Sequence, residues 1–379
     1  MDFQLSDDQR ALRSGMRDLL GAVFDRDRLR AAVERDGALD RSLWRELGAA
    51  GFFALRLPEE AGGVGLGLPE AVLLFEEAGR ALLPGPLVAT HLAAGLVKGA
   101  AEGEAVVTAV AGELPVAHLA HLAEADAVLV VGGEAAGLPG EEALGETLSG
   151  EALRAFVAAA RPVRSMDPLT PLHRAPAGAA VAGAGRVSAT EGTRAASERT
   201  RADAERAPAA TERTPAHAGR LRFEAALLTA AEQLGSAART TEAAVQHAGE
   251  REQFGSPIGS FQAVKHLCAD MLARTEPARA AVYAAAVTGD PVEIAAAKLL
   301  ADEAAVRNAR DCLQIHGGMG FTWEADVHLH LKRAWLRAAS WLTGAGAEEL
   351  LAAGLGTAGR LPRSSAAYGR PVPEAGGGG

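Results

Sequence analysis

The sequence is poor in aromatic residues and cysteine, and it carries no excess of positive charge. Only 4% of its 379 residues are Phe, Trp or Tyr, so a core would have to be packed mostly with Ala, Leu and Val. The formal net charge of −10 argues against a nucleic-acid-binding protein, because such a surface needs clustered Lys and Arg. The two cysteines, Cys268 and Cys312, lie in apolar helical patterns, and we interpret both as reduced core residues.

Two further absences concern location. No apolar stretch free of charge is long enough to span a bilayer. The acidic N-terminal segment has no apolar centre of the kind that a signal peptide needs. These features predict a cytoplasmic protein whose partners include neither a membrane nor a nucleic acid.

The sequence also lacks His, Cys or carboxylate residues at the spacing that a metal site needs. His328 and His330 fall on different faces of a helical pattern, and no Cys or carboxylate cluster completes a site with them or with His316. We therefore predict no metal.

Helical periodicity dominates both ends of the chain. Ser6 and Gln9 form a capping-box pattern, after which apolar residues recur at helical spacing. Residues 1–100 are predicted to form a helical domain, and residues 220–356 a bundle of four long antiparallel helices. Gly235 lies in the first helix of that bundle, where it would allow another helix to pack closely.

The middle of the chain, residues 101–185, has a different pattern. Apolar runs at 106–110 and 127–131 are typical of buried strands, and 162–166 is predicted as a third. Gly and Pro punctuate the rest, so we predict a small, degenerate β domain.

Two segments show no sign of a packed core. Residues 186–219 are a low-complexity mixture of Thr, Glu, Arg and Ala, predicted to be a solvated linker or disordered loop. The alternative, a long helix, lacks an apolar stripe. Residues 357–379 are rich in Gly and Pro and are predicted to be a disordered tail. The fold class predicted for the whole chain is α+β, mainly α.

Two short motifs stand out. The first, Glu-Arg-Glu-Gln-Phe-Gly, begins at Glu250. Arg251 suits a phosphate because its guanidinium donates hydrogen bonds in a planar fork. Its simpler interpretation is a surface arginine paired with Glu250 or Glu252. Phe254 would pack against a cofactor or in a core, and Gln262 is either a cofactor contact or a polar helix-surface residue.

The second motif, Gln-Ile-His-Gly-Gly-Met-Gly-Phe, begins at Gln314 and separates two helical patterns. Gly317 and Gly318 would allow positive φ and let another molecule approach the bare backbone. The simpler interpretation is a turn that ends a helix. Gln314 offers an amide to polar atoms of a ligand.

Together the two motifs resemble those of the acyl-CoA dehydrogenase family of FAD enzymes, in which an Arg-x-x-Phe-Gly turn precedes a long helix and a Gln-x-x-Gly-Gly-x-Gly-Phe turn follows it. The resemblance covers residues 6–83 and 220–344 and is weak or absent between them. It implies a helical domain, a β domain and a four-helix bundle, with FAD bound at a subunit interface. The cofactor-binding residues that it implies are Arg251, Phe254, Gln262, Gln314, Gly317, Gly318 and Thr343.

In that family a glutamate removes the α-proton of an acyl-CoA thioester, while FAD takes the β-hydride. The usual position of this glutamate falls here on Trp341. A minority of members place the base next to an arginine on the first bundle helix, and that pair of positions falls on Ala225 and Ala226. Glu224 is one residue away, which turns it about 100° around the helix. The expected base is therefore missing. The fallback candidates, each more simply interpreted as a solvated side chain, are Glu224, Glu348 and Glu349.

The β region also lacks the family's Thr-Glu-Pro-x-x-Gly-Ser-Asp type strand, which lies beside the flavin ring. The chain thus resembles the base-lacking subunits of hetero-oligomeric bacterial acyl-CoA dehydrogenases, such as those of steroid side-chain degradation. This implies an acyl-CoA thioester as substrate, a second subunit of the family as partner, and electron-transfer flavoprotein or another electron acceptor. The alternatives are a homo-oligomeric dehydrogenase with a displaced base, a flavoenzyme of the same fold with oxidase or hydroxylase chemistry, and a cofactor-free scaffold.

Overall fold

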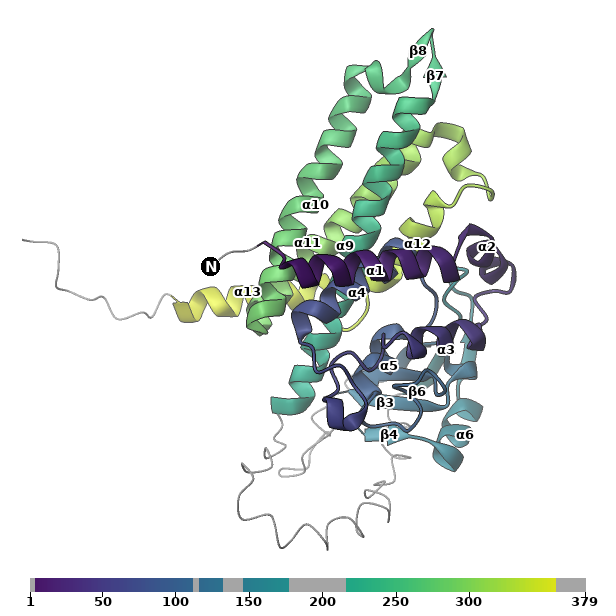
Figure 1. Cartoon of the computed structure of the whole chain (residues 1–379), viewed down its shortest axis with the longest axis vertical. Coiled ribbons are helices and arrows are strands. Elements are labelled where there is room, and N and C mark those ends of the chain that lie inside the picture. Colours follow the sequence, from purple (N-terminus) through teal and green to yellow (C-terminus); the bar gives the residue numbers. More distant parts are fainter. Residues whose placement is uncertain (1–3, 112–115, 132–145, 177–215, 359–379) are drawn as a thin grey trace, which may run out of the picture.

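The computed structural model describes residues 4–111, 116–131, 146–176 and 216–358 (Figure 1). The tail predicted at 357–379 lies outside this part of the chain, apart from its first two residues. The linker predicted at 186–219 also lies outside it up to residue 215, and residues 216–219 already belong to a helix. The predicted linker was therefore too long at its C-terminal end, because sequence patterns place helix ends only approximately.

The N-terminal part is helical. Its elements are α1 (Asp7–Val23), α2 (Arg26–Glu34), α3 (Arg41–Ala49), α4 (Leu68–Arg80) and α5 (Leu87–Ala93), with a short 3-10 turn at Glu59–Ala61. The capping box is confirmed: the Ser6 hydroxyl accepts from the Gln9 amide at 3.1 Å, and the Gln9 side chain accepts from the Ser6 amide at 3.1 Å. Several of the few aromatic residues gather in this core, where the rings of Trp44 and Phe53 lie 4.7 Å apart and those of Phe52 and Phe75 5.1 Å apart.

The middle part contains two small sheets. One is ordered β1 (Val107–Ala111), β3 (Ala127–Val131), β4 (Glu146–Leu148); the other is ordered β2 (Val116–Ala120), β6 (Leu172–Pro176), β5 (Arg161–Val163). The β1–β3 pair is parallel and the remaining pairs within these two sheets are antiparallel. Of the strand predicted at 162–166, only the first two residues lie in β5. Val163 pairs with Leu172, where β6 begins, so the following residues have no partner strand.

One helix in the middle part was not anticipated. This helix, α6 (Gly150–Ala159), buries Leu153 and Phe156 against residues of both sheets. Those two side chains are spaced by three residues, which is a helical period, but the segment is too short to have stood out from its Gly- and Glu-rich surroundings. The fold class predicted from the sequence, α+β and mainly α, is confirmed.

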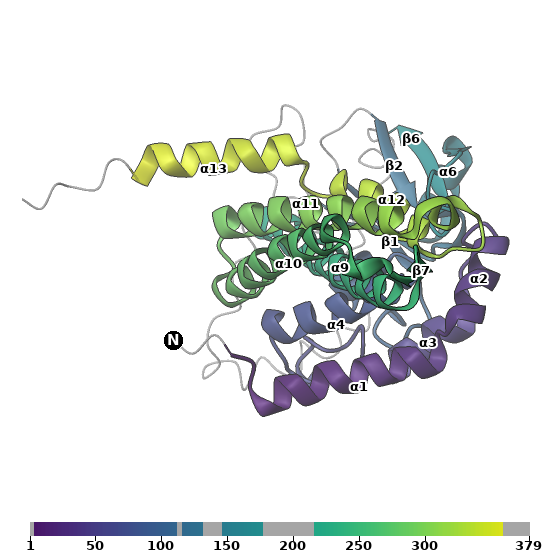
Figure 2. The ribbon, with the colours of Figure 1, turned by 90° about the horizontal axis from the view of Figure 1, so that it is seen from above.

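The C-terminal part is built on three long helices. These are α9 (Ala216–Glu250), α10 (Gln262–Thr288) and α11 (Pro291–His316); the shorter α12 (Val327–Ala338) and α13 (Gly344–Ala358) follow, and the hairpin β7 (Glu252–Gln253) and β8 (Ser256–Pro257) joins α9 to α10. Viewed from above, α4 lies between α1 and this bundle, and α13 lies on the opposite side (Figure 2). None of the described helices is both long and apolar enough to cross a membrane.

Two glycines allow α4 and α9 to touch. A Cβ added to Gly235 of α9 would lie 1.9 Å from the Glu76 carbonyl oxygen, and one added to Gly79 of α4 would lie 2.0 Å from that of Glu232. These distances are far below van der Waals contact, so a larger residue at either site would push the two helices apart. The close packing predicted for Gly235 is confirmed.

The interface between α9 and α12 is polar and buried. Glu232 accepts a hydrogen bond from Arg337 at 2.7 Å, and the Ser236 hydroxyl lies 2.8 Å from Nδ1 of His330. One turn along α12, Arg333 pairs with Asp167 of the middle part, which ties that part to the bundle. Burial and the surrounding arginines lower the pKa of His330 to about 3, so this imidazole is neutral at physiological pH.

We predict that Gly235→Ala destabilises the protein. Ala normally favours a helix by about 0.8–1 kcal/mol over Gly, but here its methyl group would overlap a backbone oxygen, and such overpacking costs about 1–3 kcal/mol. Gly249→Ala is the matched control on the same helix, because nothing lies within 4 Å of an added Cβ there. Thermal and urea unfolding should show that the first variant is less stable than the wild type and that the second is slightly more stable. Higher stability of both variants would contradict the close contact.

We also predict that acid destabilises the protein through two buried histidines. Burial, followed by the charge of Arg56, lowers the pKa of His91 to about 4, and that of His330 is about 3. An unfolded histidine titrates near pH 6.5, so below that pH the unfolded chain binds protons that the folded chain does not. Each histidine should then lower the unfolding free energy by about 1.4 kcal/mol per pH unit as the pH falls from 6.5 towards 4.

The test is the slope of unfolding free energy against pH between 7.5 and 5. His330→Gln should make the slope shallower, since Gln keeps a hydrogen-bonding group near Ser236 but cannot titrate. His118→Gln, at an exposed strand position, should leave the slope unchanged. Equal slopes for all three proteins would show that His330 does not carry the effect.

Candidate functional site

The first motif forms the tip of the bundle. The Arg251 amide donates to the His247 carbonyl at 2.9 Å as α9 ends, and the Arg251 carbonyl accepts from the Ile258 amide at 2.7 Å. Phe254 and Gly255 are the two turn residues of the hairpin, and both have positive φ. This conformation is usual for Gly but costs a phenylalanine free energy. The Phe254 side chain is 95% exposed, so it is not a core residue of this chain.

The second motif ends α11. Gly317 has φ 60° and ψ −141°, a combination that only glycine adopts readily. Nothing lies within 4 Å of an added Cβ at Gly317 or Gly318, and both residues are exposed, so their backbone is open to an incoming ligand. Gln314, one turn earlier, is also exposed. The Gly317 amide itself donates to the Gln314 carbonyl, so the turn offers a ligand close approach to bare backbone rather than a free Gly317 amide.

A pair of stacked histidines brings the two motifs together. The rings of His247 on α9 and His316 on α11 lie 4.1 Å apart at an interplanar angle of 15°. Arg251 lies one turn beyond His247, and Gly317 follows His316 directly. Gln262, at the start of α10, lies at the same end of the bundle, with its amide nitrogen 2.7 Å from His266. The structure thus gathers six of the seven predicted cofactor-binding residues at one end of the bundle.

The charged groups at this end of the bundle include Arg251, which lies between Glu250 and Glu252 in the sequence. Within the part of the chain that the structure describes, Arg251 forms no ion pair with Glu250 or Glu252, so the simpler interpretation of a paired surface arginine is not what is observed. Burial, then His316 and then Arg251 lower the pKa of His247. No group of three or more His, Cys, Asp or Glu side chains in the described residues is arranged to hold a metal ion.

The seventh residue, Thr343, lies elsewhere. It is exposed at the start of α13, where its hydroxyl accepts from the Gly346 amide at 3.3 Å. Its neighbour Trp341 has a φ of 64°, packs against two apolar clusters and accepts a hydrogen bond from Arg222 through its carbonyl at 2.9 Å. Arg222 and Arg251 lie near opposite ends of α9, roughly 40 Å apart at 1.5 Å per residue.

Glu224 is not a solvated side chain, and that expectation was wrong. Its side chain is 9% exposed and held between two arginines, with Arg56 at 2.7 Å and Arg220 at 2.9 Å. Burial alone would raise the pKa of Glu224, but the hydrogen bond and charge of Arg56, and then those of Arg220, hold it below its usual range. Glu348 and Glu349 are exposed on α13, as expected.

Sequence reasoning missed Arg56 and Arg222. Arg56 lies 168 positions before Glu224, in the segment that follows α3, and no local pattern links the two residues. Arg222 is one of several arginines near the start of α9, and nothing in the sequence distinguishes the one that holds the Trp341 carbonyl. The Arg56 contact arises when the bundle packs on the N-terminal part, and the Arg222 contact arises when the turn before α13 packs on the start of α9.

Comparisons with known proteins agree with these features. Residues 6–102 match the family model "Acyl-CoA dehydrogenase, N-terminal domain", and residues 219–358 match "Acyl-CoA dehydrogenase, C-terminal domain". The chain is 35% identical over 311 residues to acyl-CoA dehydrogenase IpdE2 of Mycobacterium tuberculosis, an alignment that covers 81% of this chain and 84% of the relative.

Two solved structures have the same fold. The ChsE4-ChsE5 complex from Mycobacterium tuberculosis matches with a TM-score of 0.72 at 23% identity, covering 96% of this chain and 100% of the other. PigA with FAD and proline matches with a TM-score of 0.73 at 19% identity, covering 94% and 99%. With the two family domains at its ends and a relative of this similarity along most of its length, the chain belongs to the acyl-CoA dehydrogenase family.

Proposed function

We propose that this protein is a flavin-holding subunit of a hetero-oligomeric acyl-CoA dehydrogenase, in which a partner subunit supplies the catalytic base. The reaction is the α,β-dehydrogenation of an acyl-CoA thioester, with FAD as the group that accepts the hydride. The observation that supports the proposal is Trp341, a partly buried indole at the position where the resemblance to the family implies the catalytic glutamate.

Within the described part of the chain, Glu224 is poorly suited to act as the base in place of the expected glutamate. Proton abstraction needs a carboxylate that is free to reach the α-carbon and whose pKa suits proton uptake. Glu224 fails on both counts, because Arg56 and Arg220 occupy both of its oxygens and lower its pKa. Ala225 and Ala226, at the position used by a minority of relatives, are fully buried and have no ionisable group.

The residues at the tip of the bundle fit the pyrophosphate end of FAD. An unpaired guanidinium and two side-chain amides supply donors that phosphate and ribose oxygens accept from, and the open glycine turn allows close approach to the backbone. In this role Arg251 would bind the phosphates, and the backbone of Gly317 and Gly318 would contact the adenosine portion. The 95% exposed Phe254 is suited to packing against the cofactor at a subunit interface.

The distance along α9 supports a shared site. Arg251 and the Trp341–Thr343 turn are roughly 40 Å apart by the length of the helix, so one flavin ring and its own phosphates cannot be held by both ends of this chain. We infer that the tip reaches the flavin of a neighbouring subunit. In this proposal the turn with Trp341 would lie near the acyl chain of a substrate bound to this subunit, and the indole would stand in place of the base.

Two solved structures of the same fold support the same proposal. The ChsE4-ChsE5 structure is named as a complex of two proteins, and PigA is named with FAD. Two other functions are open to this fold: flavin chemistry of the oxidase or hydroxylase type, and a scaffold without cofactor. Bound flavin in the purified assembly separates the scaffold from both enzymatic alternatives.

We predict that Arg251→Ala weakens flavin retention. Charge-assisted hydrogen bonds to phosphate contribute about 1.5–3 kcal/mol each, so the dissociation constant should rise by about ten- to a hundredfold. The dissociation constant of Arg251→Lys should lie between those of the wild type and Arg251→Ala, because Lys keeps the charge but loses the planar fork of donors. Arg307→Ala, at an exposed position paired with Glu303 on α11, is the control. Flavin absorbance of the assembled protein is the readout; unchanged affinity would remove Arg251 from the site.

We also predict that the chain alone dehydrogenates acyl-CoA poorly or not at all, and that activity appears on mixing with a base-carrying member of the family. Loss of a positioned base typically costs about 10²–10⁴-fold in rate. Glu224→Gln should then leave the activity of the mixture nearly unchanged, as should the exposed control Glu349→Gln.

Activity of the isolated chain that depends on Glu224 would contradict this prediction. Robust activity of the isolated chain that Glu224→Gln abolishes, with an unchanged melting temperature, would make Glu224 the base. The melting temperature is needed because the substitution also weakens the ion pairs with Arg56 and Arg220.

A further inference from the structure

A cleft of about 380 Å³ lies between α1, α2, the end of α4, α9 and α12. Its apolar lining residues are Leu20, Phe24, Leu29, Leu82 and Val327. The cleft is on the side of α9 that faces α1, away from Trp341 and from the tip of the bundle. Small-molecule sites commonly have 300–1,000 Å³, an apolar lining and a few placed polar groups.

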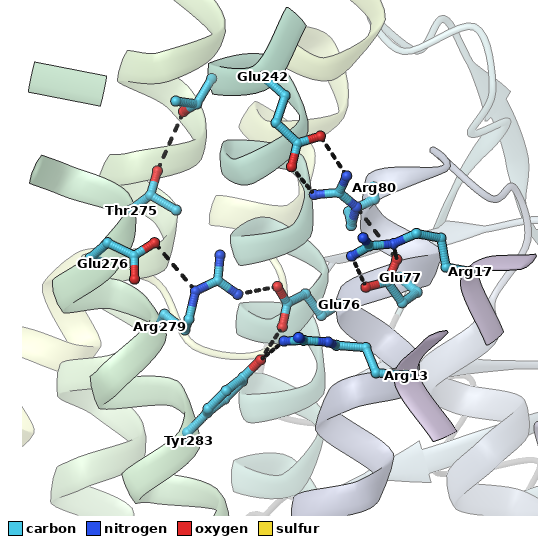
Figure 3. Close-up of polar contacts among 11 residues, drawn as sticks. Arg13, Arg17, Glu76, Glu77, Arg80, Glu242, Thr275, Glu276, Arg279 and Tyr283 are labelled. Atoms are coloured by element: carbon cyan, nitrogen blue, oxygen red, sulfur yellow. Dashed lines mark hydrogen bonds and ion pairs between the residues drawn. The ribbon is translucent and has the colours of Figure 1, made fainter. Parts of the chain in front are cut away.

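Four arginines and three carboxylates line the cleft, a formal sum of +1. Most of these charges are already neutralised. Glu77 binds Arg17 at 2.6 Å and lies 3.4 Å from Arg80, which also binds Glu242 at 2.6 Å (Figure 3). All four of these side chains therefore hold their position without a ligand.

The other acidic groups of the cleft also have partners. Asp326 pairs with Arg26 at 2.6 Å and with Arg30 at 3.3 Å. Asp25 caps α2, where its carboxylate accepts from the Arg28 amide at 2.9 Å. These contacts of Asp326 and Asp25 hold the edge of the cleft in place. One arginine that lines the cleft then remains without an ion-pair partner among the described residues.

That cation is Arg239. Among the described residues it forms no ion pair and no hydrogen bond, although it lines the cleft. Beside it, the ring of His330 is 7% exposed and lines the same cleft. The Nδ1 atom of His330 lies 2.8 Å from the Ser236 hydroxyl, and its Nε2 has no partner in the described part of the chain. If Ser236 donates to Nδ1, then Nε2–H donates into the cleft.

The neutral state of His330 reflects its burial first and the surrounding positive charge second. Burial comes first among the causes that hold its pKa near 3, followed by the charges of Arg239, Arg337, Arg333 and Arg80. Positive charge that disfavours an imidazolium favours an anion at the same place.

We propose that this cleft binds a small amphipathic carboxylate, with its head group on Arg239 and Nε2–H of His330 and its hydrocarbon chain along the apolar wall. One unpaired arginine matches one negative charge, which favours a monocarboxylate over a phosphate ester with two. The apolar lining adds affinity for a chain of several carbons. This site is separate from the proposed flavin site and does not depend on it.

Octanoate is a suitable probe, with octanamide as its uncharged counterpart and acetate as its head group alone. Titration calorimetry on the full chain should show octanoate binding, octanamide binding at least about tenfold weaker, and acetate weaker still. Because His330 remains neutral and octanoate ionised throughout, the affinity should be constant from pH 6 to 8.

Two variants with matched controls locate the site. Arg239→Gln removes the cation and should weaken octanoate binding about tenfold, whereas Arg307→Gln on α11 should not. Gly21→Leu fills the cleft from an exposed position of α1 where an added Cβ meets nothing within 4 Å; Gly15→Leu has the same freedom on α1 but lies outside the cleft. Only the first of each pair should reduce binding.

Several results would overturn the proposal. These are the absence of octanoate binding, equal binding of octanamide, or binding that neither Arg239→Gln nor Gly21→Leu reduces. A fourth contradicting result would be that both Arg239→Gln and Gly21→Leu dissociate the oligomer in size-exclusion chromatography. The cleft would then be an interface between chains. FAD content, measured in parallel, should be the same in all variants, so a failure of this proposal is distinct from a failure of the flavin assignment.

Discussion

The contact between α4 and α9 is the constraint on which the rest of the structure depends. Gly79 and Gly235 let the two backbones meet, and the neighbouring carboxylates of α4 are then buried with partners from other helices. Glu76 pairs with Arg279 of α10 and accepts from the Tyr283 hydroxyl at 2.6 Å, while Glu77 pairs with Arg17 of α1 (Figure 3). One close helix pair therefore positions the N-terminal helices on the bundle, and unpaired carboxylates there would be costly.

The long helix α9 contributes residues to three separate places along its length. Its start holds the Trp341 turn through Arg222, its middle forms one wall of the cleft that contains Arg239, and its end presents Arg251 beside the glycine turn. These three places are separated by several helical turns, so each can change without repacking the others. Under the proposed function, a subunit without its own base would in this way keep its contacts to a flavin bound by its neighbour.

Local patterns in the sequence predicted the parts of the structure that local chemistry determines. The capping box at Ser6, the strand at Ala127–Val131 and the tight packing at Gly235 each depend on residues that are near one another in sequence or on one small side chain. The burial of Glu224 could not be predicted in this way. Its partner Arg56 comes from a distant segment, and the same glutamate on an isolated helix would be solvated.

The central claim is that this chain holds the flavin phosphates for a neighbour and supplies no base. A cryo-EM structure of the assembled protein, purified with its partner and FAD, tests it most directly. The account predicts flavin phosphates against Arg251 and Gly317 of this chain, with the ring in the partner subunit beside a carboxylate of that subunit. A flavin ring against the Trp341 turn of this chain, with Glu224 released from Arg56 and facing the ring, would contradict it.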